Sequence, residues 1–232
     1  MLESTMCPEI LPALICGVFV GEPESLTDDG GTWVSSIRRE EVLGPVQVTS
    51  TGLVGDRATQ PYHGGPGAAI CVHMADHYSF WKLNYGMNLH AGSVGENITL
   101  DQITEDQICV GDIVRLGTSL LQVSGPRVPC ANQARHLGRA DWVKLTISEN
   151  RTGFYLRVLE PGTLQAGDLW QLQERVHPDG QIPAINRCMY LAFDPDYARK
   201  LIGMSALEEW WKFQFQEKLA NRDHWTASVI ND

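Results

Sequence analysis

Short apolar segments, each bounded by Gly, Asp or Pro, fill the sequence from its start to about residue 175. They are rich in Val, Ile, Leu and aromatic residues, which fit a pleated, half-buried strand. Many short strands with turn signals between them indicate a closed or nearly closed β-barrel, with helices in the longer connections. We expect strands within residues 10–20, 44–49, 69–74, 108–116, 120–124, 154–159 and 164–172.

Two connections in this part of the chain carry a helical pattern. Residues 75–85 place Tyr78, Trp81 and Tyr85 at helical spacing, so we predict a helix there. Residues 131–149 are expected to contain one or two further helices.

The spacing of apolar residues changes after the turn cluster at residues 177–180. Three segments of helical periodicity follow it. Asp194 and Pro195 are an N-cap and a first-turn proline, and they predict the start of the second helix. Ser205 and Glu208 match a capping box, which predicts the start of the third helix at that point.

The chain is therefore predicted to be mainly β with helices, in the α+β class. A β-barrel domain occupies residues 1–175 and a small three-helix domain occupies residues 176–232. Trp210 and Trp211 form an aromatic stripe in the last helix, and packing of the three helices explains it better than a cofactor site does.

Charge and cysteine usage exclude several kinds of protein. The formal net charge is −10, which disfavours binding to nucleic acid. The six cysteines include no C-x-x-C pair and the chain has no G-x-G-x-x-G fingerprint, so we expect no bound iron–sulfur cluster, zinc, NAD or flavin. Residues 10–20 follow no basic residue and are too short to cross a bilayer, so a cytoplasmic protein with free thiols is expected.

The block at residues 124–130 is the strongest candidate for chemistry. Pro126 directly precedes Arg127, and Pro129 directly precedes Cys130. The two prolines therefore restrict the backbone around both residues. A cation three residues from a cysteine also favours the thiolate form. Taken alone, this block is equally compatible with a rigid loop whose cysteine fills a hole in the core.

Two weaker candidates lie earlier in the chain. His63, Gly64 and Gly65 precede a proline, and the glycines allow backbone N–H groups to approach an anion closely, although a plain tight turn is the simpler interpretation. Glu96 and Asn97 follow a glycine, and the alternative there is an ordinary strand entrance.

A zinc site at Cys71, His73 and His77 is the remaining possibility, and we disfavour it. The catalytic glutamate of an H-E-x-x-H motif is absent, with Met74 in its place. Because a strand is expected to run into a helix near residue 75, we expect the two histidines not to face one another.

In their order along the chain, these blocks resemble the MOSC family, named for the C-terminal domain of molybdenum-cofactor sulfurases. The resemblance is strongest to its stand-alone YiiM type, which carries a short helical extension after the barrel. It covers about residues 52–172 and rests on the blocks G-D-R, H-G-G-P, H-Y-x-x-W, G-E-N-I-T, V-G-D-I-V-R-L-G, L-Q-V-S-G-P-R-V-P-C and T-G-F-Y-L-R-V-L-E-P-G.

The resemblance implies a MOSC-type β-barrel that binds a molybdenum atom chelated by a pterin, the molybdenum cofactor. The family's cysteine falls on Cys130, which would be both the metal ligand and the catalytic residue. The remaining positions implied to bind the cofactor are Arg57, His63, Gly64, Gly65, Asn97 and Arg127. We expect the helical extension to pack on the barrel without forming part of the cofactor pocket.

This sequence departs from the family pattern on either side of the expected pocket. Gly67 and Ala68 stand where many relatives carry Asp and a basic residue, and Asn132 stands where relatives often have Lys. Arg135, one helical turn later, is a candidate to supply the missing charge.

The resemblance implies a reductase of N-hydroxylated compounds, such as hydroxylamines and N-hydroxylated bases, with a separate reductase as electron donor. The alternative is a sulfur-carrier or cofactor-handling module that holds a persulfide on Cys130. In that case a separate pyridoxal-phosphate-dependent cysteine desulfurase would be a partner, because this chain has no such domain.

Overall fold

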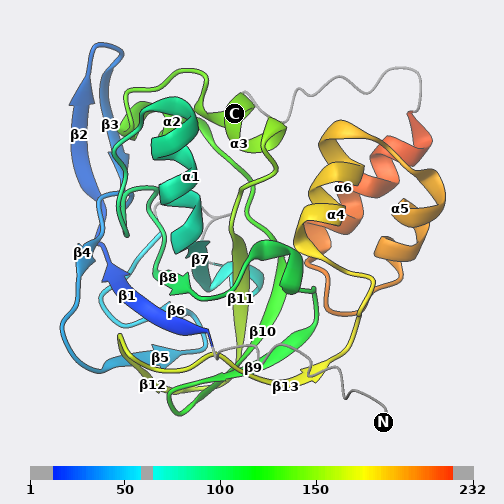
Figure 1. Ribbon diagram of the computed structural model, residues 1–232, viewed down its shortest axis with the longest axis horizontal. Coiled ribbons are helices and arrows are strands. Elements are labelled where there is room, and N and C mark those ends of the chain that lie inside the picture. Colours follow the sequence, from blue (N-terminus) through cyan, green and yellow to red (C-terminus); the bar gives the residue numbers. More distant parts are fainter. Residues whose placement is uncertain (1–12, 59–64, 222–232) are drawn as a thin grey trace, which may run out of the picture.

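The structure, a computed structural model, describes residues 13–58 and 65–221 (Figure 1). One mixed sheet contains, in spatial order, β13 (Gln171–Arg175), β9 (Asp112–Leu116), β10 (Ser119–Pro126), β11 (Phe154–Glu160), β7 (Ile70–Met74), β8 (Ile98–Asp101), β1 (Leu14–Val20) and β4 (Glu40–Glu41). Neighbouring strands are antiparallel except β7 and β8, which are parallel. The chain crosses between these two strands through α1 (Ala75–Tyr85), as a parallel pair requires.

Two smaller sheets complete the β structure. One contains β12 (Gly162–Leu164), β5 (Val46–Thr49) and β6 (Gly52–Leu53), and the other is the hairpin of β2 (Glu24–Asp28) and β3 (Gly31–Ser35). Figure 1 shows the large sheet curving into a half-barrel, with β5 and β12 along its lower edge in that view. The chain is thus an α+β protein with a barrel-like sheet, as the sequence predicts.

Two expected strands are shorter than their apolar runs. The run 108–116 becomes a strand only from Asp112, because Gly111 turns the backbone with φ +87. The run 164–172 is divided between β12 and β13 by a turn, in which Gly167 has φ +97 and the Gln165 N–H donates to the Asp168 carboxylate at 2.9 Å. Glycine adopts such positive φ values without a steric cost.

The helices of the barrel part form a second apolar cluster. Helix α1 has the bounds that the sequence predicts, and residues 131–149 contain two helices, α2 (Ala131–His136) and α3 (Trp142–Ser148). Trp81 of α1 and Trp142 of α3 are fully buried, with ring centroids 5.0 Å apart. This contact fixes α1 against α3 on one side of the sheet.

The C-terminal part consists of α4 (Ile182–Asn186), a π-helical turn (Arg187–Leu191), α5 (Pro195–Ile202) and α6 (Glu209–Ala220). Asp194 caps α5 as predicted, since its carboxylate accepts the N–H groups of Asp196 and Tyr197. Among the described residues, no helix is long and apolar enough to cross a membrane.

The predicted capping box at Ser205 is wrong. Helix α6 begins at Glu209, and the N-cap is Glu208, whose carboxylate accepts the Trp210 N–H at 2.6 Å. The reason is a tertiary hydrogen bond: the Glu208 N–H donates to the Ser124 carbonyl of β10 at 2.9 Å, so the helix starts only after that contact.

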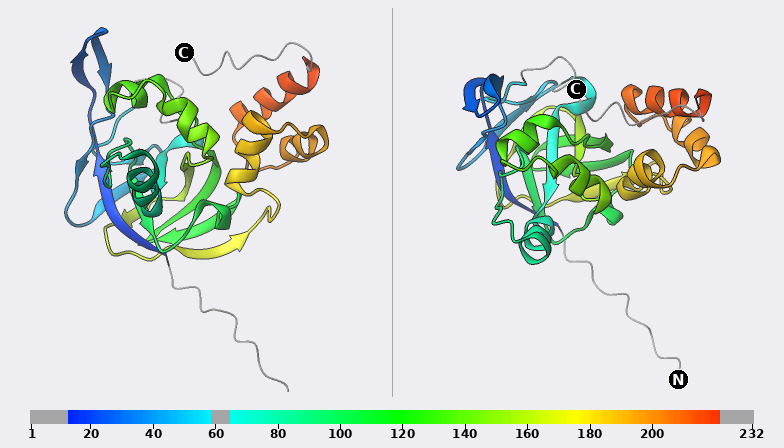
Figure 2. Two further views of the ribbon diagram at one scale, coloured as in Figure 1. Left: turned by 45° about the horizontal axis from the view of Figure 1, so that its top comes forward. Right: turned by 90° about the horizontal axis from the view of Figure 1, so that it is seen from above.

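The helical unit stands beside the sheet as a separate group in Figures 1 and 2, yet it shares the barrel's core. Leu201, Leu207 and Phe215 belong to the same buried cluster as Leu121 of β10 and Leu156 of β11. Burial of apolar area across this contact stabilises both parts together.

Candidate functional site

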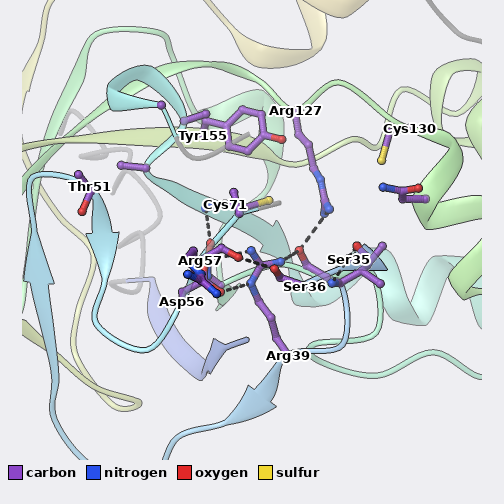
Figure 3. Close-up of a pocket in the computed structure, with 18 residues that line it drawn as sticks. Ser35, Ser36, Arg39, Thr51, Asp56, Arg57, Cys71, Arg127, Cys130 and Tyr155 are labelled. Carbon is purple, nitrogen blue, oxygen red and sulfur yellow. Dashed lines mark hydrogen bonds and ion pairs between the residues drawn. The ribbon is translucent and has the colours of Figure 1, made fainter. Parts of the chain in front are cut away.

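A cavity of about 620 Å³ opens where the ends of β7, β10 and β11 meet the turns that follow β3 and β5 (Figure 3). Its wall brings together segments that are far apart in sequence, and it contains three arginines but one carboxylate. The described residues that line it are Ser35, Ser36, Ile37, Arg39, Thr51, Asp56, Arg57, Ala58, Gly65, Ala68, Ala69, Cys71, Gly95, Asn97, Arg127, Cys130, Asn132 and Tyr155.

Cys130 lies at the N-cap of α2, in extended backbone with φ −131 and ψ 161. Its N–H donates to the side-chain oxygen of Gln133 at 3.2 Å, which ties the cysteine to the first turn of the helix. The thiol is half-buried and lines the cavity, as expected for a side chain that could bind a metal there.

Arg127 is buried, with only 6% of its surface exposed. One terminal nitrogen donates to the Gly95 carbonyl at 3.2 Å, whereas Nη1 has no hydrogen-bond partner among the described residues. Burial acts to lower the pKa of Arg127, but the neighbouring Cys71 and Tyr155 raise it above its ordinary value. The cavity therefore contains a fixed positive charge with one unused donor.

Arg39 is a second cation in the cavity wall, half-buried, which the sequence motifs did not identify. Its guanidinium donates to both carboxylate oxygens of Asp56, at 2.7 and 3.0 Å, and to the Gly95 carbonyl at 2.7 Å. Gly95 must be glycine here, because its φ is +69 and an added Cβ would lie 2.6 Å from Ile37. Arg39 and Arg127 thus meet at one backbone carbonyl.

Arg57 and Asn97 both line the cavity, one at its rim and the other within the strand framework. The Arg57 guanidinium is 70% exposed and pairs with Glu22 at 3.1 Å, so it lies at the rim. The Asn97 amide accepts the Cys71 N–H at 3.0 Å and donates to the Phe19 carbonyl at 3.2 Å. Both ends of this amide are therefore used to hold β7 and β1 in place.

The glycine turn is only partly visible. His63 and Gly64 lie outside the described residues, and Gly65 lines the cavity just before the 3-10 turn Pro66–Ala68. Arg135 does not replace a missing cavity charge, because it donates twice to Asp28, at 2.7 Å each, and is not among the lining residues.

Besides Arg39, the sequence analysis did not identify Cys71 and Tyr155 as residues of this cavity. Cys71 is buried, and it forms part of the cavity wall beside Arg127 (Figure 3). Tyr155 pairs with Cys71 across β11 and β7, and its phenol lies toward Arg127 in the same view. Burial raises the pKa of both groups, so both stay protonated at neutral pH.

The histidines beside this wall face each other, contrary to expectation. The ring centroids of His73 and His77 are 4.8 Å apart, because β7 passes into α1 without an intervening loop. Burial lowers the pKa of His73 to about 4. The described part of the chain contains no group of three or more His, Cys, Asp or Glu side chains placed to hold a metal ion.

Fold and site together define a class: a half-barrel with a cavity lined by thiols and arginines, followed by a three-helix extension. A model of the MOSC domain matches residues 59–170. YflK of Bacillus subtilis (strain 168) is 33% identical over 201 residues, which cover 86% of this chain and 91% of that protein. The chain belongs to the MOSC domain family.

Solved structures agree with this assignment. The crystal structure of YiiM from Geobacillus stearothermophilus matches with a TM-score of 0.77 and 32% identity. The match covers 90% of this chain and 100% of that one.

A further relative in sequence, a protein named Reductase from Gibberella moniliformis (strain M3125 / FGSC 7600), is 33% identical over 162 residues. These residues are 68% of this chain but 29% of that protein.

Proposed function

We propose that this protein is a molybdenum-cofactor-dependent reductase of N-hydroxylated compounds. The observation that carries the proposal is the pairing of a half-buried thiol, Cys130, with the unused donor of Arg127 on the wall of one cavity. Thiolate is a soft ligand suited to a soft metal centre, and a buried guanidinium suits an anionic pterin phosphate. A cavity of about 620 Å³ also lies within the usual range for cofactor pockets.

The donor set of the cavity fits this cofactor. Cys130 would be the metal ligand, Arg127 would hold an anionic group, and Gly65 would lie against the cofactor. The other two positions of this block that the family resemblance implies, His63 and Gly64, lie outside the described residues. Arg57 would close the rim. When bound, the molybdenum–pterin group supplies the two-electron chemistry.

The protein's own residues would then bind the substrate and hold the side chains of the cavity in fixed positions. Reduction of R–NHOH consumes two electrons and two protons, breaks the N–O bond, and releases R–NH₂ and water. Tyr155 carries its proton at neutral pH, so its phenol can donate a hydrogen bond to the substrate's oxygen. The ion pair of Arg39 and Asp56 fixes one part of the cavity wall, and Arg39 also holds the Gly95 carbonyl to which Arg127 donates.

Several features support a reductase with an external electron supply. A relative over 68% of this chain bears the name Reductase. The sequence has no dinucleotide fingerprint and no spaced cysteines for an iron–sulfur relay. We infer that a separate reductase, in the cytoplasm, delivers the electrons to this protein.

The test is metal content and turnover of protein made in a host that synthesises the cofactor. Molybdenum that stays bound through purification, with reduction of an aliphatic or aryl hydroxylamine by reduced viologen, supports the proposal. Cys130→Ser replaces a soft sulfur with a hydroxyl that stays protonated, and it should abolish turnover and remove most of the metal.

Cys188→Ser is the matched control, since Cys188 is buried in the helical unit, and it should keep both properties. Undiminished turnover and metal content in Cys130→Ser would overturn the ligand assignment. Sulfane sulfur on Cys130 without molybdenum would instead favour the sulfur-carrier function, with a cysteine desulfurase as partner.

A further inference from the structure

The start of α6 touches the loop that carries the candidate site. The indole N–H of Trp211 donates to the Pro126 carbonyl at 3.2 Å, in a buried hydrogen bond directly before Arg127. Two residues earlier, the Ser124 carbonyl accepts the Glu208 N–H at 2.9 Å. The helical unit thus makes two hydrogen bonds to the end of β10, where the loop 126–130 begins.

Trp211 is held firmly enough to act as a fixed support for this loop. It is 2% exposed, and its ring lies 5.1 Å from Trp210 and 6.2 Å from Phe215, centroid to centroid. A Cβ on Gly125 would lie 2.9 Å from its Cδ1, so this glycine is what lets the indole reach the backbone. These close contacts on several sides of the buried indole leave the ring no alternative position.

Glu208 contacts Gly67, in a second segment that contributes residues to the cavity wall. An added Cβ on Gly67 would lie 2.4 Å from the Glu208 Cγ, so the Glu208 side chain occupies the space beside the turn that follows Gly65. The Ser124 hydroxyl also donates to the Gly67 carbonyl. The first turn of α6 and the end of β10 therefore join two segments that line the cavity, residues 65–69 and 126–130.

We propose that Trp211 and Glu208 are positioning residues for the candidate site, so that the C-terminal helical unit is part of the site's framework. The other hydrogen bonds that this loop donates are those of the Arg127 N–H to the Gly153 carbonyl at 2.9 Å, the Arg127 guanidinium to Gly95 and the Cys130 N–H to Gln133, and none of them involves the helical unit. No described residue of the helical unit lines the cavity, as expected, so this unit would support the site from outside the pocket. A role of these contacts in catalysis rests on the proposed function, whereas their role in holding the loop 126–130 is independent of it.

The experiment uses the full-length, cofactor-free protein, so it can be interpreted whether or not the protein proves to be a reductase. Trp211→Phe keeps an aromatic ring and removes the N–H donor. Amide hydrogen exchange, followed by mass spectrometry of peptides, should rise about fivefold in residues 124–130, the size expected for loss of one buried hydrogen bond. Exchange in α5 should stay unchanged.

Trp210→Phe is the matched control, because the same chemical change falls one residue away, on an indole whose nitrogen has no hydrogen bond within the described ranges. It should leave exchange in residues 124–130 as in the natural protein. Unchanged exchange there in Trp211→Phe, or an equal rise throughout α5, α6 and the loop, would overturn the proposal and leave Trp211 a general stabiliser of the helical unit.

Discussion

Arg39 and Asp56 form a two-point ion pair, with Nε to Oδ1 at 2.7 Å and Nη2 to Oδ2 at 3.0 Å. Their side chains are only 12% and 9% exposed. Asp56 also accepts the Gly21 N–H at 2.9 Å, so the pair joins the end of β1 to the turn beyond β6. A charge pair at this depth is strongly coupled, because removal of either member leaves the other without compensation.

Asp56→Asn should therefore destabilise the fold. It keeps the size of the side chain but leaves the Arg39 guanidinium without its counter-charge, at a cost of about 3 kcal/mol. For a chain of this length such a loss lowers the melting temperature by about 6–12 °C, measurable by calorimetry. Asp141→Asn is the control, because Arg139 holds Asp141 with the same two-point geometry, at 2.6 and 3.2 Å, on the surface. If both substitutions lowered the melting temperature equally, burial of the Arg39–Asp56 pair would not be the reason for its effect on stability.

Gly67→Ala tests the contact between the glycine turn and α6. The added Cβ would lie 2.4 Å from the Glu208 Cγ, so Glu208 must rotate away and release the Trp210 N–H that it caps. Loss of an N-cap costs about 1 kcal/mol, which chemical denaturation can resolve. Gly65→Ala, two residues earlier, meets nothing within 4 Å and has φ −67, so its stability should match the natural protein. If Gly67→Ala is as stable as Gly65→Ala, the close approach of Glu208 is incorrect.

Glu105 predicts how stability depends on pH. Burial raises the pKa of Glu105 from 4.5 to about 8, and the charge of Asp76 raises it as well. The hydrogen bond that Glu105 accepts from the Gly153 N–H and the charge of Arg151 both act to lower it. Between these two values the unfolded chain releases a proton that the folded chain keeps. Stability should therefore fall as the pH rises from about 4.5 to 8, by up to about 1.4 kcal/mol per pH unit.

Glu105→Gln keeps an acceptor for the Gly153 N–H and does not titrate, so it should flatten this profile and gain stability over the natural protein above pH 7. Urea unfolding at a series of pH values measures the difference. Glu174→Gln, on the exposed strand β13, should reproduce the natural profile. A Glu105→Gln profile parallel to that of the natural protein would show that Glu105 is ionised in the fold.

Much of the fold could be predicted because it is encoded locally. The bounds of α1 follow from the spacing of its aromatic residues, and the cap of α5 follows from Asp194 and Pro195. The start of α6 could not be predicted, because the hydrogen bond from Glu208 to Ser124 joins residues 84 positions apart and overrides the local capping signal at Ser205.

The candidate site divides in the same way. Arg127 and Cys130 stand in one short block whose prolines make it recognisable. Cys71 and Tyr155 are brought together by strand register, because they pair across β7 and β11, and Arg39 reaches the cavity from the segment between β3 and β4. Their contribution becomes visible only when the sheet is formed.

The source of electrons is open to a direct test. Because the chain has no dinucleotide fingerprint and no cysteine spacing for an iron–sulfur cluster, we expect NADPH alone to give no turnover with a hydroxylamine substrate. Reduced viologen, which needs no docking site of its own, should drive the reaction. The measurement is anaerobic substrate loss under each donor, with cofactor-loaded protein. Steady oxidation of NADPH by the purified chain would contradict the need for a separate reductase.

Arg127→Lys separates the charge of Arg127 from its geometry. Lysine keeps the positive charge, but all its donors are on one nitrogen, so it cannot occupy both the position that bonds the Gly95 carbonyl and the separate position of Nη1. Loss of one charge-assisted hydrogen bond of about 1.4 kcal/mol would weaken cofactor binding about tenfold, so the molybdenum retained per protein should fall after dialysis against buffer.

Arg135→Lys is the matched control, because the guanidinium of Arg135 donates to Asp28 and to the Gly31 carbonyl but lies outside the cavity lining. It should retain as much molybdenum as the natural protein. Since Arg127 is buried and its replacement could disturb folding, the melting temperatures of both variants are measured alongside the metal content. A folded Arg127→Lys protein with full metal content would mean that the unused donor of Arg127 does not bind the cofactor, and that the anionic group is held elsewhere in the cavity.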